Sequence, residues 1–393
     1  MIEKLKNVFL KNGDKTAYIV NNEKITYKEL WDKSNSLAQY LKQQGDSSVI
    51  VYGNKNIEML ISFIACLIAE RAYIPLDTYI PFERLKKIIS TTNSELLINN
   101  CSCEVKINDI EIISLSDFYF FNKDYNYIED DNSIAYIIFT SGSTGAPKGV
   151  PISKKNLLNF INWIRDLKPL KDRKNTKVLN QASFSFDLSV ADLYYSLLNG
   201  HTLVSLDNEA QNDFVKMFSI IKSEKINVAV MTPTFMKLLL LDSDFKSENF
   251  PDFDTVYFCG ERLDVPTVKK LYQRFPDINI INAYGPTEAT SAVSAVVIEK
   301  EMLDMEILPV GDCSNLATEV EIIDEEIVLK GKSIFSGYIG GITGGYYREN
   351  NIDCYKTGDL GYISDDKLFC TGRKDNQLKF KGYRIELEDI EIT

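Results

Sequence analysis

Apolar positions along the chain follow two alternating periods, one typical of helices and one typical of buried strands. From Thr26 to Gly45 the apolar residues return every three or four positions, and Thr26 with Glu29 forms a capping box that opens a helix. The short apolar run 49–52 then predicts a buried strand. The same patterns predict helices at 57–69, 155–167, 188–198, 214–223 and 265–275, and strands at 72–77, 135–139, 177–179, 228–231, 255–259 and 279–281.

This alternation of strands and helices predicts an α/β fold with doubly wound, mostly parallel sheets. Beyond about residue 310 the pattern changes to short segments rich in Val, Ile and Tyr, which typically form antiparallel strands. The glycines that separate these segments are Gly331, Gly337, Gly340, Gly341, Gly344 and Gly345. We therefore expect a small antiparallel β unit after the parallel sheets.

Composition and charge narrow the class of protein. The 393 residues carry a formal net charge of -12, which argues against a broad nucleic-acid or anionic-membrane surface, because such surfaces need clustered Lys and Arg. The longest apolar stretch, 57–69, is shorter than the roughly 20 residues of a membrane span. The first residues do not resemble a secretory signal. We expect a cytoplasmic protein with no membrane span and no nucleic-acid partner.

The cysteines and the histidine limit the possible chemistry. Seven cysteines are present and only Cys101 and Cys103 are close in sequence, so we expect reduced thiols and see neither a disulfide framework nor CxxC metal spacing. The single histidine, His201, excludes multi-histidine metal sites and argues against Ser-His hydrolysis. We expect it to be a loop residue beside Gly200.

The stretch FTSGSTGAPKGVP, residues 139–151, is the first candidate site. It follows the predicted strand 135–139, and a Gly/Ser/Thr loop in that place presents backbone N–H groups and hydroxyls to a single point. Its spacing differs from GxxxxGK[ST], so it is not a P-loop of that type. A flexible surface loop with a solvated lysine is the alternative. The preceding strand and the Pro147-Lys148 pair favour a phosphate-binding loop.

The segment TSGSTGAPKG resembles the phosphate loop of the adenylate-forming enzymes, a family of amino-acid adenylation domains, acyl-CoA synthetases and luciferases. Four further motifs of the family follow in order: FSFDLS at 184–189, NAYGPTEAT at 282–290, YKTGDLG at 355–361 and GRKDNQLKFKGYRIELEDIE at 372–391. The resemblance implies two doubly wound, mostly parallel sheets packed together, plus a small distorted β-barrel. It implies an adenylation core over 1–374, with its β-rich subdomain at about 311–374.

The resemblance also implies a site for ATP and Mg²⁺. Asn282 and Tyr284 are expected to hold and stack the adenine, Asp359 to accept the ribose hydroxyls and Glu288 to coordinate Mg²⁺. A carboxylate oxygen suits this hard cation. The expected catalytic residues are Lys148, Thr287, Glu288 and Arg373. The expected ATP-binding residues are Thr140, Ser141, Gly142, Ser143, Thr144, Gly145, Asn282, Ala283, Tyr284, Gly285, Pro286, Thr287, Asp359, Cys370 and Arg373.

Three residues are expected to contact the second substrate, a small amino acid. In family members that activate amino acids, the residue matching Asp187 pairs with the α-ammonium group. A helix N-cap is the alternative, because Asp opens helices well. Cys259 and Ser291 are expected to border the side chain, with a small buried core thiol as the alternative for Cys259. Together they favour alanine over serine or glycine.

Within the family, the likeness is greatest to members that load D-alanine on a carrier protein for teichoic-acid modification. Alternatives are a stand-alone or nonribosomal-peptide adenylation domain for another amino acid, and an inactive nucleotide-binding sensor. The resemblance makes Asp375 the hinge, and residues 375–393 the hinge and the start of a truncated C-terminal domain. The family's catalytic lysine lies beyond them, so we expect this chain to form adenylate slowly. The final acceptor is the phosphopantetheine thiol of a carrier protein.

Overall fold

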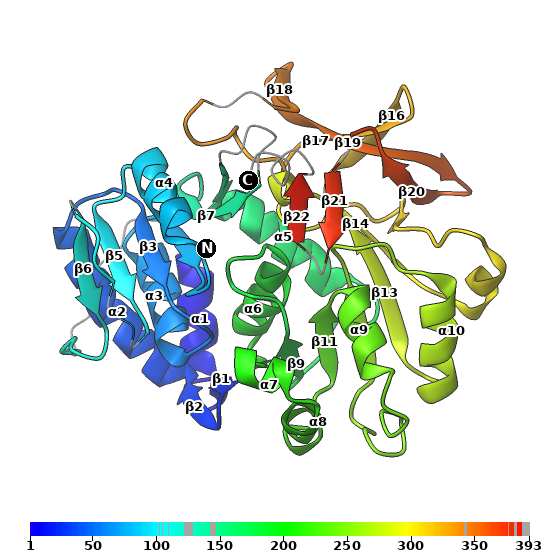
Figure 1. The fold of residues 1–393 in the computed structure, drawn as a ribbon, viewed down its shortest axis with the longest axis horizontal. Coiled ribbons are helices and arrows are strands. Elements are labelled where there is room, and N and C mark those ends of the chain that lie inside the picture. The colour runs from blue at the N-terminus through cyan, green and yellow to red at the C-terminus, as the bar shows by residue number, and fades with distance from the viewer. Residues whose placement is uncertain are drawn as a thin grey trace.

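The chain folds into two mostly parallel sheets that lie side by side and an antiparallel sheet that crosses one end of them, as the computed structural model shows (Figure 1). The structure describes residues 1–101, 103, 105–108, 110–121, 129–141, 147–341, 344–375, 377–380 and 383–386. Among these residues, no helix is both long enough and apolar enough to cross a membrane.

The first sheet has the strand order β6-β5-β3-β4-β7-β8, and all its neighbouring strands are parallel except the β7–β8 pair. Its strands are β3 (Val49–Tyr52), β4 (Tyr73–Leu76), β5 (Leu96–Asn99), β6 (Glu111–Ser114), β7 (Ile134–Thr140) and β8 (Lys148–Ser153). Its helices are α2 (Tyr27–Gln43), α3 (Ile57–Ile68) and α4 (Phe82–Thr92). The strands β3, β4 and β5 are buried at every position, as expected of a sheet covered on both faces.

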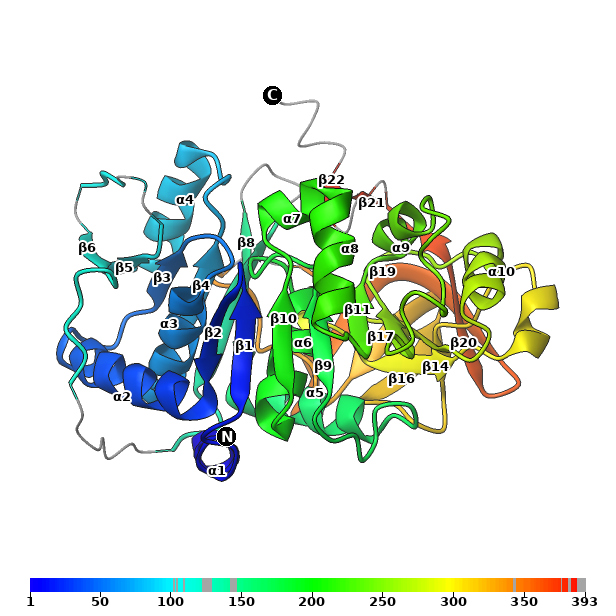
Figure 2. The ribbon, with the colours of Figure 1, turned by 90° about the horizontal axis from the view of Figure 1, so that it is seen from below.

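The second sheet has the order β14-β13-β12-β11-β9-β10-β1-β2, with antiparallel strands only at its two edges. Its strands are β1 (Thr16–Val20), β2 (Glu23–Thr26), β9 (Lys177–Asn180), β10 (Thr202–Ser205), β11 (Val228–Met231), β12 (Thr255–Phe258), β13 (Asn279–Tyr284) and β14 (Ser294–Val297). Its helices are α1 (Ile2–Lys11), α6 (Leu188–Asn199), α7 (Asn208–Asn212), α8 (Phe214–Ser223), α9 (Pro233–Leu239) and α10 (Val265–Arg274). The helix α5 (Lys154–Asp166) packs against β7 and β8 of the first sheet and against α6. In Figure 2, α8, α9 and α10 line one side of this sheet.

The antiparallel sheet has the order β15-β20-β19-β17-β16, and β18 pairs with β19. Its strands are β15 (Gly311–Asp312), β16 (Glu319–Ile323), β17 (Glu326–Lys330), β18 (Tyr346–Glu349), β19 (Ile352–Ser364) and β20 (Lys367–Arg373), and a separate hairpin of β21 (Gln377–Phe380) and β22 (Tyr383–Glu386) follows. The expected β-rich unit after residue 310 is therefore present. Within the described residues, its strand pairings leave β15 and β16 as two edges.

The two parallel sheets share one hydrophobic core. This core includes β4 and β7 of the first sheet, β12 of the second sheet, and the helices α3, α5 and α6. Phe63 of α3 packs edge-on against Phe184, and the Tyr73 and Tyr194 hydroxyls are 2.7 Å apart across the boundary. The outer face of each sheet has its own core, under α8, α9 and α10 in one case and under α4 in the other. The shared core holds the motif loops of both sheets together.

The elements follow the sequence pattern closely, and local chemistry explains where they begin. The capping box at Thr26 is formed, because the Thr26 hydroxyl accepts the Glu29 N–H and the Glu29 carboxylate accepts the Thr26 N–H. The helix 214–223 and the strand 228–231 have the predicted bounds. The strand predicted at 279–281 continues to Tyr284, so the first three residues of the NAYGPTEAT motif are its last positions.

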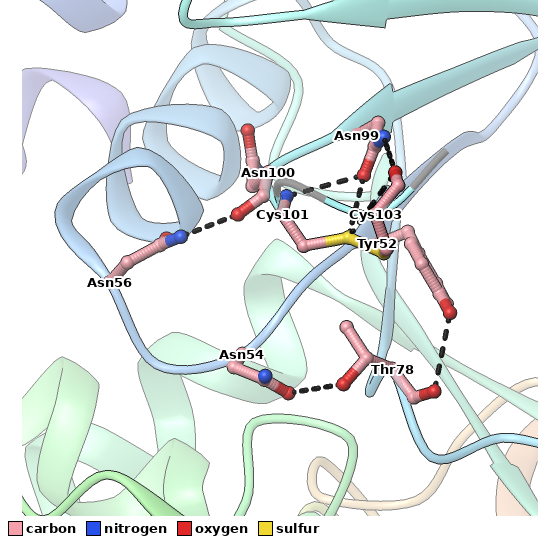
Figure 3. The surroundings of a disulfide bond; sticks show 8 residues. All are labelled: Tyr52, Asn54, Asn56, Thr78, Asn99, Asn100, Cys101 and Cys103. Carbon is pink, nitrogen blue, oxygen red and sulfur yellow. Dashed lines mark hydrogen bonds between the residues drawn. A yellow bond between two sulfur atoms is a disulfide. The ribbon is translucent and has the colours of Figure 1, made fainter. Parts of the chain in front are cut away.

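The expectation of reduced thiols is wrong for Cys101 and Cys103, which form a disulfide after β5 (Figure 3). Asn99 explains how two cysteines so close in sequence meet. Its side-chain oxygen accepts the Cys101 N–H at 3.2 Å, and its amide donates to the Cys103 carbonyl at 2.9 Å, so the chain turns back on itself. The other cysteines of the described chain form no disulfide: Cys66, Cys259, Cys313, Cys354 and Cys370.

Candidate functional site

A cavity of about 240 Å³ lies between the second sheet and the antiparallel sheet. Its walls come from the ends of β12 and β13 and from β19 and β20. Ligands of doubly wound folds bind at the carboxyl ends of the strands, so the cavity lies where such a fold places a ligand. Seven of the predicted ATP-binding residues line it: Asn282, Ala283, Tyr284, Gly285, Asp359, Cys370 and Arg373.

A chain of four polar side chains crosses one side of this cavity. The Tyr284 hydroxyl donates to Asp359 Oδ2 at 2.6 Å, and Arg373 Nη1 donates to Asp359 Oδ1 at 2.7 Å. The other two guanidinium nitrogens of Arg373 bind the Asp375 carboxylate at 2.6 and 2.7 Å. Burial, and then the nearby Asp359 carboxylate, raise the pKa of Tyr284 well above its usual value, so Tyr284 stays a neutral donor.

The backbone at the end of β13 is held close to its surroundings. The Asn282 side-chain amide donates to the Pro309 carbonyl at 2.8 Å. Gly285 allows a tight approach, since a Cβ at this position would lie 2.5 Å from the Ala292 Cα. Pro286 and the one-turn helix η1 (Thr287–Ala289) follow directly. The motif NAYGPTEAT is thus a strand end and a turn that the structure fixes from both sides.

Glu288 of η1 is fully buried, with 0% of its surface exposed. Its Oε1 accepts a hydrogen bond of 2.7 Å from the Tyr338 hydroxyl. Burial, and then the Glu288 charge, raise the pKa of Tyr338, so the phenol keeps its proton and remains the donor. A buried carboxylate is costly without such support. Thr287 lies next to it and is partly exposed.

The structure describes the two ends of the phosphate-loop motif. Thr140 ends β7, Lys148 begins β8, and the two residues face each other in the antiparallel β7–β8 pair. Ser141 directly follows β7. The Lys148 ammonium lies 5.8 Å from the centre of the Tyr338 ring. The predicted residues Gly142, Ser143, Thr144 and Gly145 lie outside the described residues.

Asp187 is at the N-cap position of α6, but its side chain makes no capping hydrogen bond. It is 8% exposed, and its backbone is helical (φ -63°, ψ -22°), unlike the extended N-caps of α2 and α5. Burial, and then its charge, raise the pKa of Tyr136 well above the usual value. Its carboxylate also contributes to the raised pKa of Tyr257. The alternative of a helix cap therefore does not explain this buried carboxylate.

Cys259 and Ser291 meet, although they are 32 positions apart in the sequence. The Cys259 thiol donates to the Ser291 carbonyl at 3.8 Å, and both residues are buried. Ser291 has a left-handed backbone (φ 69°), and its hydroxyl has no hydrogen-bond partner among the described residues. The hydroxyls of Tyr136 and Tyr257 are likewise buried and unpartnered within the described chain. Asp187, Cys259 and Ser291 thus belong to one region rich in buried, unused hydroxyl groups.

Three residues that contact the predicted site residues or the turn before Asp187 were not identified from the sequence: Asp77, Tyr257 and Tyr338. Asp77 lies after β4, and its Oδ2 accepts hydrogen bonds from the hydroxyls of Ser183 and, at 2.7 Å, Ser185. It thereby fixes the turn that leads to Asp187. The sequence signal was weak for each residue, because Asp77 merely follows a strand, Tyr257 lies inside one, and Tyr338 is one of several tyrosines in a glycine-rich stretch.

The doubly wound sheets, the cavity at their strand ends and the collinear motifs define an adenylate-forming enzyme. A model of the family described as AMP-binding enzyme matches residues 5–339, and the chain belongs to this family. The D-alanine--D-alanyl carrier protein ligase of Bacillus licheniformis is 38% identical over 416 residues, which cover 100% of this chain and 82% of the relative. The ligase of the same name from Bacillus cytotoxicus is 37% identical, with the same shares covered.

Solved structures agree on the fold. The Vibrio cholerae adenylation domain AlmE, in complex with glycyl-adenosine-5'-phosphate, matches with a TM-score of 0.89 and 25% identity, over 99% of this chain and 82% of that one. PA1221, a protein with adenylation and carrier (PCP) domains, has a TM-score of 0.88 at 22% identity, over 100% and 82% of the two chains. The expectation of an adenylation-type α/β fold from the motifs is therefore confirmed.

Proposed function

We propose that this enzyme activates D-alanine with ATP as D-alanyl-AMP, releases pyrophosphate and transfers the aminoacyl group to the phosphopantetheine thiol of a carrier protein. The observation that carries the proposal is the buried region around Asp187, Cys259 and Ser291, where the hydroxyls of Tyr136, Tyr257 and Ser291 have no hydrogen-bond partner among the described residues. The Asp187 carboxylate gives this region an acidic group that can bind the ammonium group of an amino acid. Relatives at 36 to 38% identity named D-alanine ligases support D-alanine as the substrate.

The nucleotide arrangement supports the first step. The cavity beside Asn282 and Tyr284 is assigned to the adenine. Asp359 is assigned to the ribose, because the two oxygens of a carboxylate can accept hydrogen bonds from both ribose hydroxyls. The amino-acid carboxylate attacks the α-phosphorus in line, and pyrophosphate leaves. Lys148 and Arg373 place positive charge near the phosphates. The nucleophile is already an anion, so the step needs no general base, in agreement with a chain whose one histidine, His201, is buried.

Mg²⁺ fits the donor set at Glu288. This carboxylate is a hard oxygen ligand that is fully buried and fixed through one oxygen by Tyr338. The ion, when bound, would neutralise charge on the phosphates. Thr287, beside it, is assigned to the α-phosphate. The fit rests on the chemistry of the residues present.

The second half of the reaction involves a domain arrangement and a partner. We assign residues 1–374 to the adenylation core and Asp375 to the hinge. The structural neighbour PA1221 combines adenylation and carrier domains, which supports a carrier protein as the acceptor. Loading of a phosphopantetheinylated carrier protein, followed by intact-protein mass spectrometry, tests this half separately.

ATP–pyrophosphate exchange tests the first half. We expect exchange with D-alanine to exceed that with L-alanine, D-serine, D-valine and D-phenylalanine. Glycine belongs in the panel, because the neighbour AlmE was solved with glycyl-adenosine-5'-phosphate. Binding of the corresponding aminoacyl sulfamoyl-adenosines, measured by calorimetry, reports the same preference without turnover. A preference for valine or phenylalanine in both assays would contradict the proposed substrate, and ATP binding with no amino-acid-dependent exchange would indicate a nucleotide sensor.

A further inference from the structure

Tyr338 lies where three parts of the molecule meet. Its own segment follows β17 in the antiparallel sheet, and the neighbouring Ile339 N–H donates to the Gly149 carbonyl of β8 at 2.9 Å. On the other side, the Phe335 N–H donates to the Glu288 carbonyl at 2.9 Å. The segment 335–339 therefore bridges the strand that follows the phosphate loop and the turn that carries Glu288.

The side chain of Tyr338 makes the same bridge. Its hydroxyl donates to Glu288 Oε1 at 2.7 Å, while its ring lies 5.8 Å from the Lys148 ammonium. The ring packs edge-on against Phe335 with centroids 4.8 Å apart, and the Tyr355 hydroxyl lies 3.2 Å from its own. These contacts hold the ring so that its hydroxyl lies within hydrogen-bond distance of Glu288 Oε1. One side chain thus contacts both the carboxylate and the ammonium group.

We propose that Tyr338 is a positioning residue for the triphosphate end of the site. Its hydroxyl fixes the rotamer of Glu288 so that the carboxylate presents its oxygens to the metal, and its ring face supports the Lys148 ammonium. The role rests on the proposed function of Glu288 as a Mg²⁺ ligand. Groups that orient a metal ligand typically affect metal affinity about 10- to 100-fold when they are removed.

The test compares Tyr338→Phe with Tyr346→Phe. Tyr338→Phe removes the hydrogen bond to Glu288 but keeps the ring beneath Lys148. Tyr346→Phe is the matched control, because Tyr346 belongs to the same aromatic cluster through Phe335 and also donates to a carboxylate, that of Asp353 at 2.8 Å. Both changes remove one hydroxyl of the same kind, and only one of those hydroxyls touches Glu288.

The main readout is the Mg²⁺ concentration at half-maximal ATP binding, followed with a fluorescent ATP analogue. For Tyr338→Phe we expect it to rise about tenfold or more, while Tyr346→Phe stays within about twofold of the parent. The KM of the amino acid should stay within about twofold in both variants. An unchanged Mg²⁺ dependence in Tyr338→Phe, or an equal shift in both variants, would overturn the positioning role.

A double-mutant cycle distinguishes an effect through Glu288 from general damage to the fold. If Tyr338 acts through Glu288, Tyr338→Phe should add little to the defect of Glu288→Gln, whereas independent losses would multiply. Multiplied losses would therefore overturn the proposal. If Glu288→Gln itself leaves Mg²⁺-dependent ATP binding intact, the assignment of the metal ligand fails first, and with it the role of Tyr338.

Discussion

At the scale of single residues, the burial of three side chains bears on substrate recognition: Asp187, Cys259 and Ser291. All three are buried, and the Ser291 hydroxyl has no hydrogen-bond partner among the described residues. Buried polar groups are normally satisfied, so we expect a ligand to complete the contacts of an unpartnered hydroxyl of this kind. Substitutions at these positions should therefore change substrate recognition more than folding.

Asp187→Asn should raise the KM for the amino acid far more than the KM for ATP. The change removes a charge-assisted contact in a desolvated site, which is worth roughly 2 to 5 kcal/mol, or about 30-fold or more in KM. Pyrophosphate exchange at varied amino-acid and ATP concentrations measures both constants. Asp213→Asn is the control, because Asp213 caps α8 through the Val215 and Lys216 N–H groups and Asn caps equally well. Unchanged constants in both variants would contradict the pairing of Asp187 with the ammonium group.

Cys259→Gly should admit larger amino acids. If the thiol borders the substrate side chain, its removal frees space for additional methylene groups, each worth at most about 1 to 3 kcal/mol of discrimination. Exchange rates with alanine, serine, valine and phenylalanine, for the parent and the variant, give the profile. An unchanged profile would show that Cys259 is only a core thiol.

At the scale of elements, the turn between β9 and α6 determines where Asp187 lies. Ser183 and Ser185 in this turn both donate to Asp77, which belongs to the loop after β4 in the other parallel sheet. Lys55, which follows β3 of the first sheet, binds backbone carbonyls where the same turn begins. Its ammonium group donates to the Asn180 and Gln181 carbonyls at 3.2 and 2.7 Å. The first sheet thus holds an element of the second.

Asp77→Ala should loosen this turn. Hydrogen bonds to a charged group are worth about 1.5 to 3 kcal/mol each, so the free energy of unfolding should fall by at least about 1.5 kcal/mol, and the amino-acid KM should rise with it. Urea denaturation and exchange kinetics measure the two effects. The neighbouring substitution Thr78→Ala serves as control, because the Thr78 hydroxyl donates to Asn54 and not to the turn. A stability loss with an unchanged KM would separate the turn from substrate binding.

At the scale of the whole molecule, the single histidine links stability to pH. His201 is 2% exposed, and burial, followed by the charges of Arg173 and Lys15, lowers its pKa to about 4. The unfolded chain has an ordinary histidine pKa near 6.5, so between about pH 6.5 and 4 the unfolded state binds the proton more strongly. Protonation therefore costs stability as the pH falls through this window.

His201→Phe should remove this component of acid sensitivity. The parent should lose up to about 3 kcal/mol more than the variant between pH 7 and pH 4, because carboxylate contributions common to both proteins cancel in the difference. Phe keeps a ring beside Tyr195. Because His201 Nδ1 has no hydrogen-bond partner within the described chain, the loss of this atom leaves no partner unsatisfied. Urea denaturation at several pH values gives the comparison. Parallel stability curves for the two proteins would contradict the assignment.

The sequence alone determined the fold class, the order of the elements and the family. Helix periodicity, capping residues and buried strand runs are local signals, so α8 and β11 could be predicted to their bounds and β13 to its start. The motif residues Asn282, Tyr284 and Asp359 were identified differently, through the resemblance of short stretches to the motifs of a known family. All three line one cavity, as expected of a doubly wound fold, which binds its ligands at the carboxyl ends of the strands.

Only the tertiary structure decided which side chains support these motifs. Tyr338 reaches Glu288 across 50 positions, and Asp77 reaches Ser183 across 106, and no local period or spacing encodes either contact. The Cys101–Cys103 disulfide was missed for a related reason, because it depends on the turn that Asn99 forms and not on cysteine spacing. Local patterns specify elements, whereas the partners of a buried polar group are set by which elements pack together.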